Sequence, residues 1–445
     1  MEKTAKKVTK TPESKPIKPH PVFKSFERFG ISFSNHLLCS PFMEHQADRK
    51  GKVTPALIRH YVSMIQQGVG AVIVESAYVS QQGRNNLHQL GISEEEHLEG
   101  LTQLVKAVKK EGGAIGISLT HAGAKTSEFI CGEQPVSPSP CNFGRDFDTS
   151  REFDIGDREE IILHFVHAAE RAQEVGMDFI EIHGTDQHLL DQCFSIKFNN
   201  REDEFGPSSL EDRMRLPMEI VHAIKQRDSI SLPISYQFSI HEKLEDGFNS
   251  DELQQLIKML EKNGIDFFHP MPPHILNRVF DEDENLLEWI SKFTKKPIIA
   301  EGNIKSPMVL KDISMLRLAD WYVMERSIYA RPQWFQFLKR KLVSCADRSM
   351  KRSIVETKKA PPPVGPYSQA IQAGNMVFVS GQIALQPETN EIPEDFTAQC
   401  HQVLKNLQAI LETSGSSLER TVKVMIYMTD IDRFNELNEI YAGYL

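Results

Sequence analysis

The sequence predicts an α/β protein, with a closed (β/α)8 TIM barrel followed by a small α+β domain. From about residue 35 to residue 343, eight short apolar runs alternate with amphipathic helical stretches, which is the pattern of parallel strands joined by helices. An open doubly wound sheet would normally carry a G-x-G-x-x-G turn after its first strand, and SPFMEHQADRKGK contains none. A length of 445 residues suits one large domain and one small domain.

The eight apolar runs predict the strands of the barrel. In chain order they are LLCSPF (37–42), GAVIVE (70–75), AIGISL (114–119), DFIEI (178–182), PISYQFS (233–239), IDFFH (265–269), PIIAE (297–301) and ADWYVM (319–324).

The stretches between these runs carry helix signals. Thr54 followed by Pro55 predicts the N-cap and first position of a helix over 54–67. Ser93 and Glu96 have the spacing of a capping box at the start of a helix over 93–111. Further helices are predicted over 157–176 and over 250–264, the latter ending at a glycine.

Composition excludes several functional classes. The formal net charge of -10 argues against a broad nucleic-acid surface, and no run of 18 apolar residues indicates a membrane span. Six scattered cysteines without a C-x-x-C pair indicate reduced thiols rather than a disulfide framework or a zinc cluster. We therefore expect a cytoplasmic protein without nucleic-acid or membrane partners.

The chain divides by composition into four segments. Residues 1–21 form a basic, proline-containing tail that we expect to be disordered, and residues 22–343 form the barrel. A charged segment over 344–360 is the linker to a second domain over 361–445. There we expect strands over 375–385 and 420–430 and helices over 394–415 and 432–445.

The stretch EIHGTDQHLLDQ (181–192) is the strongest candidate site. His183, Asp186, His188 and Asp191 crowd together directly after the fourth predicted strand, where a barrel carries its chemistry. These side chains could bind a metal, transfer protons, or only hydrogen-bond one another. Their spacing is not that of a helical pair and no second ligand cluster follows, so we assign no metal. The long loop over 120–156 is expected to form a lid or wall of the same mouth.

Several motifs give residues from about 30 to 340 a family resemblance. They are NHLLCSPF, GVGAVIVESAYVSQQGR, GISEEEHLEGL, IGISLTHAG, EIH, NNREDEFGPSSLEDRMRL, AEGNI and ADWYVMERSIYARPQW. Through these motifs the chain resembles the Old Yellow Enzyme family of FMN-dependent NADH:flavin oxidoreductases. The resemblance implies FMN as the cofactor, NAD(P)H as the electron donor and a small electrophile as the substrate.

The resemblance also implies residues that contact the flavin ring. Ser40 and Pro41 match the end of the first strand, and Ser76 matches a small residue on the second. Ser118 stands where the family has Gln, and Gln237 stands where it has Arg. Losing that Arg removes a positive charge that would stabilise an anionic reduced flavin.

At the phosphate end, Gly302 and Arg326 match family positions whose backbone N–H groups bind the phosphate. Glu325 replaces the preceding glycine and places an anion close to another anion. Met43 replaces the Thr or Cys that tunes the flavin potential.

Family members hold the substrate carbonyl with a His-x-x-His or His-x-x-Asn pair, and a Tyr two residues later donates the proton. Here His183 matches the first donor, Asp186 the second, and His188 the Tyr position. An ionised Asp186 only accepts hydrogen bonds, so it must be protonated by burial or must hold His183 or His188 as an imidazolium, which is a stronger acid. His188 is then the expected replacement for the proton donor.

Residues from about 355 to 445 resemble the RidA-like (YjgF-type) imine deaminases, which have a chorismate-mutase-like fold, through GPYSQAI, MVFVSGQI and DIDRFNELNEIYAGYL. Tyr367, Ser380, Gly381 and Asn438 match family pocket positions. The resemblance implies homo-oligomers formed through this domain, with the trimer as the family's form. The family's substrate-gripping Arg and its Glu fall beyond Leu445, so we expect a truncated domain without deaminase activity.

Three hypotheses follow. The barrel is an FMN-dependent oxidoreductase that reduces activated C=C bonds of small electrophiles; or it has lost its flavin and is a scaffold or small-molecule binder. In the third, a fuller RidA-like domain deaminates imines or enamines.

Overall fold

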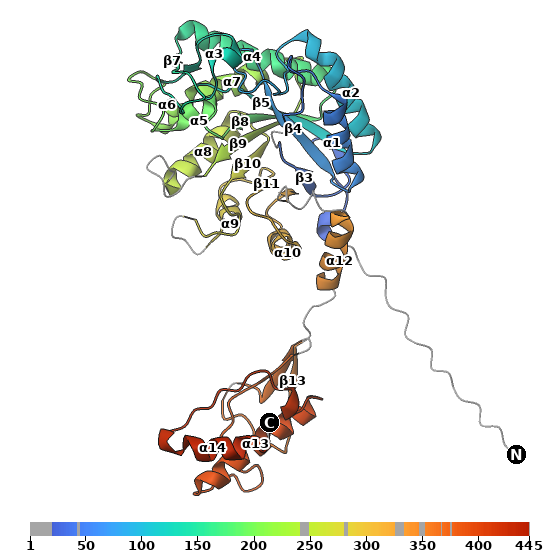
Figure 1. Cartoon of the computed structure of the whole chain (residues 1–445), viewed down its shortest axis with the longest axis vertical. Helices are drawn as coiled ribbons and strands as arrows, with labels where there is room; N and C mark the ends of the chain where they lie inside the picture. The colour runs from blue at the N-terminus through green and yellow to red at the C-terminus, as the bar shows by residue number, and fades with distance from the viewer. Residues whose placement is uncertain are drawn as a thin grey trace, which may run out of the picture. The chain divides into compact units, whose positions relative to one another are not determined.

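The computed structural model describes residues 20–41, 45–240, 249–279, 284–324, 333–346, 352–365, 367–373 and 376–444. The chain divides into two compact units, Met1–Val343 and Ser344–Leu445 (Figure 1). Almost all of the predicted N-terminal tail lies outside the described residues. None of the described helices is long and apolar enough to cross a membrane.

The first unit is an eight-stranded barrel, as predicted, and every predicted apolar run supplies one strand. Neighbouring strands are parallel in the order β10-β9-β8-β5-β4-β3-β12-β11, and a parallel bridge between Phe268 and Ile298 closes the ring. The strands are β3 (Leu37–Cys39), β4 (Ala71–Tyr78), β5 (Ala114–Thr120), β8 (Phe179–Gly184), β9 (Ile234–Ser239), β10 (Phe267–Met271), β11 (Ile299–Ala300) and β12 (Trp321–Val323).

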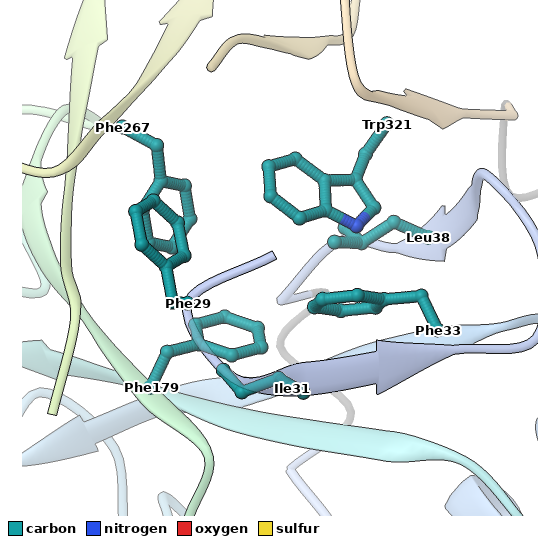
Figure 2. A pocket seen from close by; sticks show the side chains of 7 residues that line it. All are labelled: Phe29, Ile31, Phe33, Leu38, Phe179, Phe267 and Trp321. Carbon is teal, nitrogen blue, oxygen red and sulfur yellow. The ribbon is translucent and has the colours of Figure 1, made fainter. Parts of the chain in front are cut away.

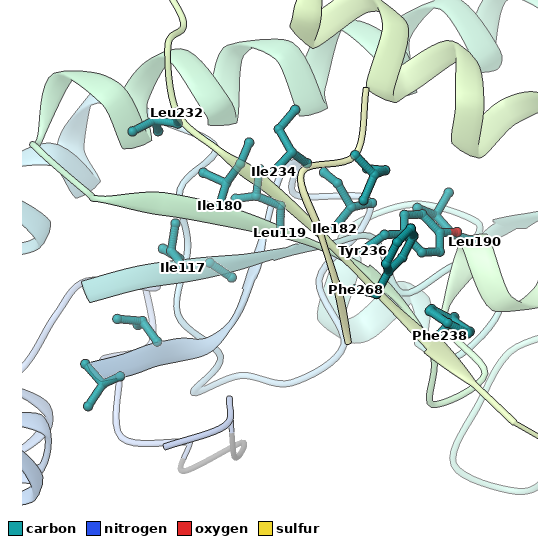
Figure 3. Packing of buried hydrophobic residues seen from close by; sticks show 14 of the residues in the cluster. Ile117, Leu119, Ile180, Ile182, Leu190, Leu232, Ile234, Tyr236, Phe238 and Phe268 are labelled. Carbon is teal, nitrogen blue, oxygen red and sulfur yellow. The ribbon is translucent and has the colours of Figure 1, made fainter. Parts of the chain in front are cut away.

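Helices surround these strands (Figure 1). They are α1 (Pro55–Gln66), α2 (Leu98–Lys110), α4 (Ile155–Glu174), α5 (Leu189–Phe194), α6 (Leu210–Arg213), α7 (Arg215–Lys225), α8 (Ser250–Lys262), α9 (Leu286–Ile290), α10 (Pro307–Leu316) and α12 (Trp334–Ala346). Apolar side chains of the strands and helices form the main core between them, part of which is shown in Figure 3.

The predicted helix starts are partly confirmed. The Thr54 side chain accepts a hydrogen bond from the backbone N–H of Leu57, so it is the N-cap of α1. The capping box at Ser93 is wrong, because a short 3-10 turn, η2 (Glu95–His97), precedes α2 and its cap is Glu94. The Glu94 carboxylate accepts a hydrogen bond from the backbone N–H of His97, and the His97 ring accepts one from the backbone N–H of Glu94. Ser93 therefore lies outside the helix.

A hairpin that was not predicted closes the amino-terminal end of the barrel. Strands β1 (Phe26–Arg28) and β2 (Ile31–Phe33) pair antiparallel, and their turn carries Phe29 against the barrel floor. Figure 2 shows the rings of Phe179, Phe267 and Trp321 gathered there. This floor is filled by apolar side chains, so any site must lie at the opposite, carboxyl end of the strands.

The long loop between β5 and α4 contains short elements of its own. They are α3 (Glu128–Cys131), β6 (Val136–Ser137) and β7 (Arg151–Glu152), and the two strands pair in parallel. The loop therefore has a fixed structure over much of its length and borders the carboxyl end of β5.

The second unit has an α+β structure. Its antiparallel sheet contains β13 (Arg352–Val355), β14 (Ala370–Ala373) and β15 (Met376–Val379), and its helices are α13 (Phe396–Thr413) and α14 (Phe434–Tyr441). Two 3-10 turns, η3 (Leu418–Arg420) and η4 (Ile431–Arg433), lie between the helices. The strand predicted over 420–430 is wrong, because this stretch has no pairing partner and its apolar Val422 and Tyr427 are exposed.

Candidate active site

Polar side chains replace the usual branched apolar ones in the upper interior of the barrel. Phe179 belongs to the floor, and side chains two and four residues further along a strand lie on the same face, so Glu181 and His183 line the interior above it. On β10 the same alternation places His269 above Phe267. A buried polar layer that opens towards the carboxyl end of the strands marks the site.

His183 lies at the centre of this layer. Its side chain is 3% exposed, and its Nδ1 is 3.3 Å from the Oγ of Ser76 on β4. Its Nε2 is buried and makes no hydrogen bond to any described residue; the nearest charged atom is Oδ2 of Asp186, at 3.5 Å. Burial lowers the pKa of His183, although the Asp186 carboxylate acts in the opposite direction.

Asp186 is the exposed member of this pair, because 62% of its side chain is accessible. Protonation by burial, one of the two expectations from the sequence, therefore does not apply. The second expectation was a carboxylate that holds a histidine as an imidazolium. Asp186 does lie 3.5 Å from Nε2 of His183, but burial outweighs it and lowers the pKa of that ring. Asp186 and Gln187 both adopt left-handed backbone conformations, with φ of 59° and 57°, which turns the chain sharply after β8.

His188 is buried, and both of its ring nitrogens are engaged. Nδ1 lies 2.7 Å from Oγ1 of Thr120, and Nε2 lies 3.2 Å from Nδ2 of Asn85. An amide nitrogen only donates, so Nε2 accepts and Nδ1 carries the proton. Burial holds the pKa of His188 well below its usual value, so the ring is neutral near pH 7. In its predicted role as proton donor, His188 would have to release the Nδ1 proton that it shares with Thr120.

An ionic cluster below His183 was not singled out from the sequence. His269 Nδ1 lies 2.7 Å from Oε2 of Glu181, and its Nε2 lies 2.9 Å from Oε2 of Glu301. His269 and Glu181 are fully buried and Glu301 is 14% exposed. The available signal was an ionisable residue at or near the end of each of three strand runs, DFIEI, IDFFH and PIIAE.

The residues predicted to contact a flavin ring lie on neighbouring strands at this mouth. Ser40 and Pro41 directly follow β3, and Ser76 lies in β4 beside a shift in strand register. Ser118 Oγ and Gln237 Oε1 are buried, and neither makes a well-directed hydrogen bond with a described residue. The pyrimidine edge of a flavin offers both donors and acceptors, so these two side chains suit it.

Gly302 has a φ of 124°, which favours glycine, and an added Cβ would lie 2.7 Å from the carbonyl oxygen of Pro272. Its backbone is thus packed closely against the loop after β10. Arg326, Glu325 and Met43 lie outside the described residues.

The predicted pocket residues of the second unit lie on different elements. Ser380 follows β15, and its Oγ donates to the carbonyl oxygen of Ser368, next to the half-exposed Tyr367. No described atom lies within 4 Å of a Cβ built on Gly381. Asn438 is exposed on α14. The roles of these residues remain predictions.

No three His, Cys, Asp or Glu side chains within the described ranges are arranged to hold a metal ion.

Two family models match the chain. Residues 22–344 match the NADH:flavin oxidoreductase / NADH oxidase family, and residues 357–445 match the family described as Endoribonuclease L-PSP. These matches confirm both resemblances predicted from the motifs.

Curated relatives share the barrel. A NADH oxidase of Thermoanaerobacter brockii is 35% identical over 332 residues, which cover 70% of this chain and 50% of the relative. A NADPH dehydrogenase of Clostridium acetobutylicum is 32% identical over 317 residues, which cover 70% of this chain and 92% of the relative. A NADH:acrylate oxidoreductase of Vibrio harveyi is 32% identical over 289 residues, covering 62% of this chain and 29% of the relative. The chain thus spans half of the first relative and most of the second.

Solved structures share the fold. The Old Yellow Enzyme homologue from Zymomonas mobilis has a TM-score of 0.63 at 20% identity, covering 72% of this chain and 93% of its own. Morphinone reductase in complex with tetrahydroNAD has a TM-score of 0.63 at 21% identity, covering 73% and 91%. The barrel and its polar mouth agree with the family model that matches residues 22–344. The chain therefore belongs to the NADH:flavin oxidoreductase / NADH oxidase family.

Proposed function

We propose that the barrel is an FMN-dependent NAD(P)H oxidoreductase of the ene-reductase type, which reduces activated C=C bonds of small electrophiles. Flavin-dependent NAD(P)H oxidoreduction follows from the family, and relatives named NADH oxidase and NADPH dehydrogenase share it. The observation that carries the proposal is the position of His183, buried at the end of β8 in the same mouth as Ser118 Oγ and Gln237 Oε1, which make no well-directed hydrogen bond with a described residue.

In this proposal, Ser118 and Gln237 hold the polar edge of the flavin, and Ser40 with Pro41 lies along the ring. Gly302 and Arg326 bind the phosphate end through backbone N–H groups and positive charge. When bound there, FMN would supply the hydride-transfer chemistry that links NAD(P)H to one carbon of the substrate's double bond.

His183 is the proposed polarising residue. Its Nδ1 can accept a hydrogen bond from the Ser76 hydroxyl, which leaves the proton of the neutral ring on Nε2. A substrate oxygen that displaces the Asp186 carboxylate from Nε2 would receive this hydrogen bond as negative charge develops on it. Asp186 orients His183 until the substrate arrives.

His188 has a supporting role in this proposal. Thr120 and Asn85 hold its neutral ring beside His183, with 4.9 Å between the two ring centroids. Because its nitrogens are engaged, the proton for the second carbon of the double bond comes from water at the mouth.

Flavin content and reduction test the proposal. Purified protein, or protein reconstituted with FMN, should absorb in the visible range, and anaerobic NADH or NADPH should bleach it. Addition of 2-cyclohexen-1-one should restore the oxidised spectrum, and His183→Ala should slow this step about a hundredfold while leaving the bleaching rate intact. Protein that remains colourless after reconstitution would contradict the redox assignment.

A further inference from the structure

The Asp186 carboxylate covers the only ring nitrogen of His183 that could face a substrate. Nε2 of His183 is buried and unpaired among the described residues, whereas Asp186, 3.5 Å away, is 62% exposed. A molecule that enters the mouth therefore meets the carboxylate before it meets the imidazole. An ionised carboxylate only accepts hydrogen bonds, so it repels the oxygen of a developing enolate and attracts a cationic N–H group.

The turn that presents this carboxylate is braced by three side chains, one from the loop after β5 and two from α5. Lys125 Nζ donates to the carbonyl oxygen of Asp186 at 2.7 Å. Oδ2 of Asp191 accepts from the N–H of Gln187 at 2.7 Å, and Gln192 Nε2 donates to the carbonyl oxygen of Gln187 at 2.7 Å. The backbone of the left-handed pair is thus held at both residues, and the carboxylate is directed by the fold.

The charges around this turn favour a cation. Lys125 is positive, and Asp186 and Asp191 are negative. His183 and His188 are neutral near pH 7, because burial lowers the pKa of each ring. The group therefore carries a net charge of about −1, which attracts a positively charged ligand.

The site also differs from what the reduction of an enone requires, and this difference favours a cationic substrate. Reduction of an enone needs two donors for the carbonyl oxygen and a proton for the second carbon. Here the second donor is replaced by an acceptor, Asp186, and the nitrogens of His188 are occupied by Thr120 and Asn85. A cation that accepts a hydride needs neither a carbonyl donor nor a proton on carbon.

We propose that the preferred hydride acceptor of this barrel is a protonated imine, whose C=N⁺–H group pairs with the Asp186 carboxylate. The inference rests on the proposed hydride transfer and names its substrate class. The imine carbon gains the hydride, the π electron pair moves to nitrogen, and the positive charge on nitrogen is lost. The product is an amine, and NAD(P)H is oxidised to NAD(P)⁺, so atoms and electrons balance.

Two substrates and one substitution test the inference with the FMN-loaded full chain. 2-Methyl-1-pyrroline is the protonated-imine probe and 2-cyclohexen-1-one is the enone probe. The wild type should have the higher kcat/KM for the imine. Asp186→Asn replaces the acceptor with a group that also donates, so kcat/KM should fall at least about tenfold for the imine and rise for the enone. Asp146→Asn, on an exposed carboxylate of the loop between β5 and α4, is the control and should change neither value.

Binding provides a second readout that needs no turnover. Calorimetry with pyrrolidinium, a cation of the product type, should show binding to the wild type that weakens about tenfold in Asp186→Asn and is unchanged in Asp146→Asn. Two outcomes would overturn the inference alone. One is an equal loss of kcat/KM for both substrates in Asp186→Asn. The other is a wild type whose flavin is reduced by NAD(P)H but which shows no preference for the imine. Failure of NAD(P)H to reduce the flavin would instead overturn the proposed function together with it.

Discussion

His269 Nδ1 and Oε2 of Glu181 lie 2.7 Å apart in the interior of the barrel, and neither side chain is accessible to solvent. The other ring nitrogen contacts Glu301. Burial alone would lower the pKa of His269, but the two carboxylates outweigh it and raise the pKa to about 10. The barrel therefore holds an imidazolium cation one strand away from Gln237, the position where the family's Arg is missing.

Replacing His269 should destabilise the barrel. His269→Gln leaves Glu181 and Glu301 without their cation, and the loss of one partner from a buried ionic group costs about 3–5 kcal/mol. Urea unfolding followed by tryptophan fluorescence reports on the barrel, because all three tryptophans lie in the first unit. The control His222→Gln, on the exposed side of α7, should stay within about 0.5 kcal/mol of the wild type.

The double variant Glu181→Gln/His269→Gln separates the charge from the packing. Because it removes one carboxylate together with the cation, it should be more stable than the sum of the single losses predicts. If the stability losses of the two single variants simply add in the double variant, His269 contributes packing rather than charge.

The same cation predicts a loss of stability at alkaline pH. The folded pKa of about 10 exceeds the unfolded value near 6.5, so the folded state holds an extra proton between these values. Stability from this group is complete below about pH 6.5 and is lost as the pH rises towards 10, with a slope of up to about 1.4 kcal/mol per pH unit. Urea midpoints at pH 7, 8 and 9 measure the slope, and His269→Gln should flatten it.

The barrel could be predicted because its signals are local. Apolar runs and helix caps such as Thr54 depend on residues adjacent in sequence, and all eight runs became strands. The hairpin before β3 was missed because its strands are only three residues long. The stretch 420–430 alternates like a strand, but a strand also needs a neighbour, and sequence alone does not supply one.

The candidate site could be predicted only in part. The stretch after the fourth strand identified His183, Asp186 and His188, which the structure brings to one mouth. Exposure of the Asp186 side chain excludes its protonation by burial, and exposure depends on the whole fold. Partners from distant strands, such as Asn85 for His188, could not be inferred from spacing.

Acid should also destabilise the barrel, through histidines that are buried without charge. Burial lowers the pKa of His183 and His188, and that of His121 to about 3. The unfolded chain protonates these residues near pH 6.5, so their contribution is present above that value and is lost as the pH falls below it, by up to about 1.4 kcal/mol per pH unit for each residue. Urea midpoints between pH 5 and 6.5 should show this slope. A shallower slope in His121→Gln would show how much His121 contributes to this loss of stability. An unchanged slope would show that His121 does not contribute.

Flavin affinity should depend on Ser118 Oγ and Gln237 Oε1, two buried atoms without a well-directed hydrogen bond to any described residue. Gln237→Ala and Ser118→Ala each remove a group that can hydrogen-bond the pyrimidine edge, and a hydrogen bond contributes about 1 kcal/mol, so each should raise the Kd for FMN about fivefold. Quenching of FMN fluorescence during titration of flavin-free protein measures the Kd. Gln226→Ala, at the end of α7 and exposed, is the matched control. If Gln237→Ala and Gln226→Ala bind FMN equally well, the flavin edge lies elsewhere, and Gln237 acts only on its neighbour His183.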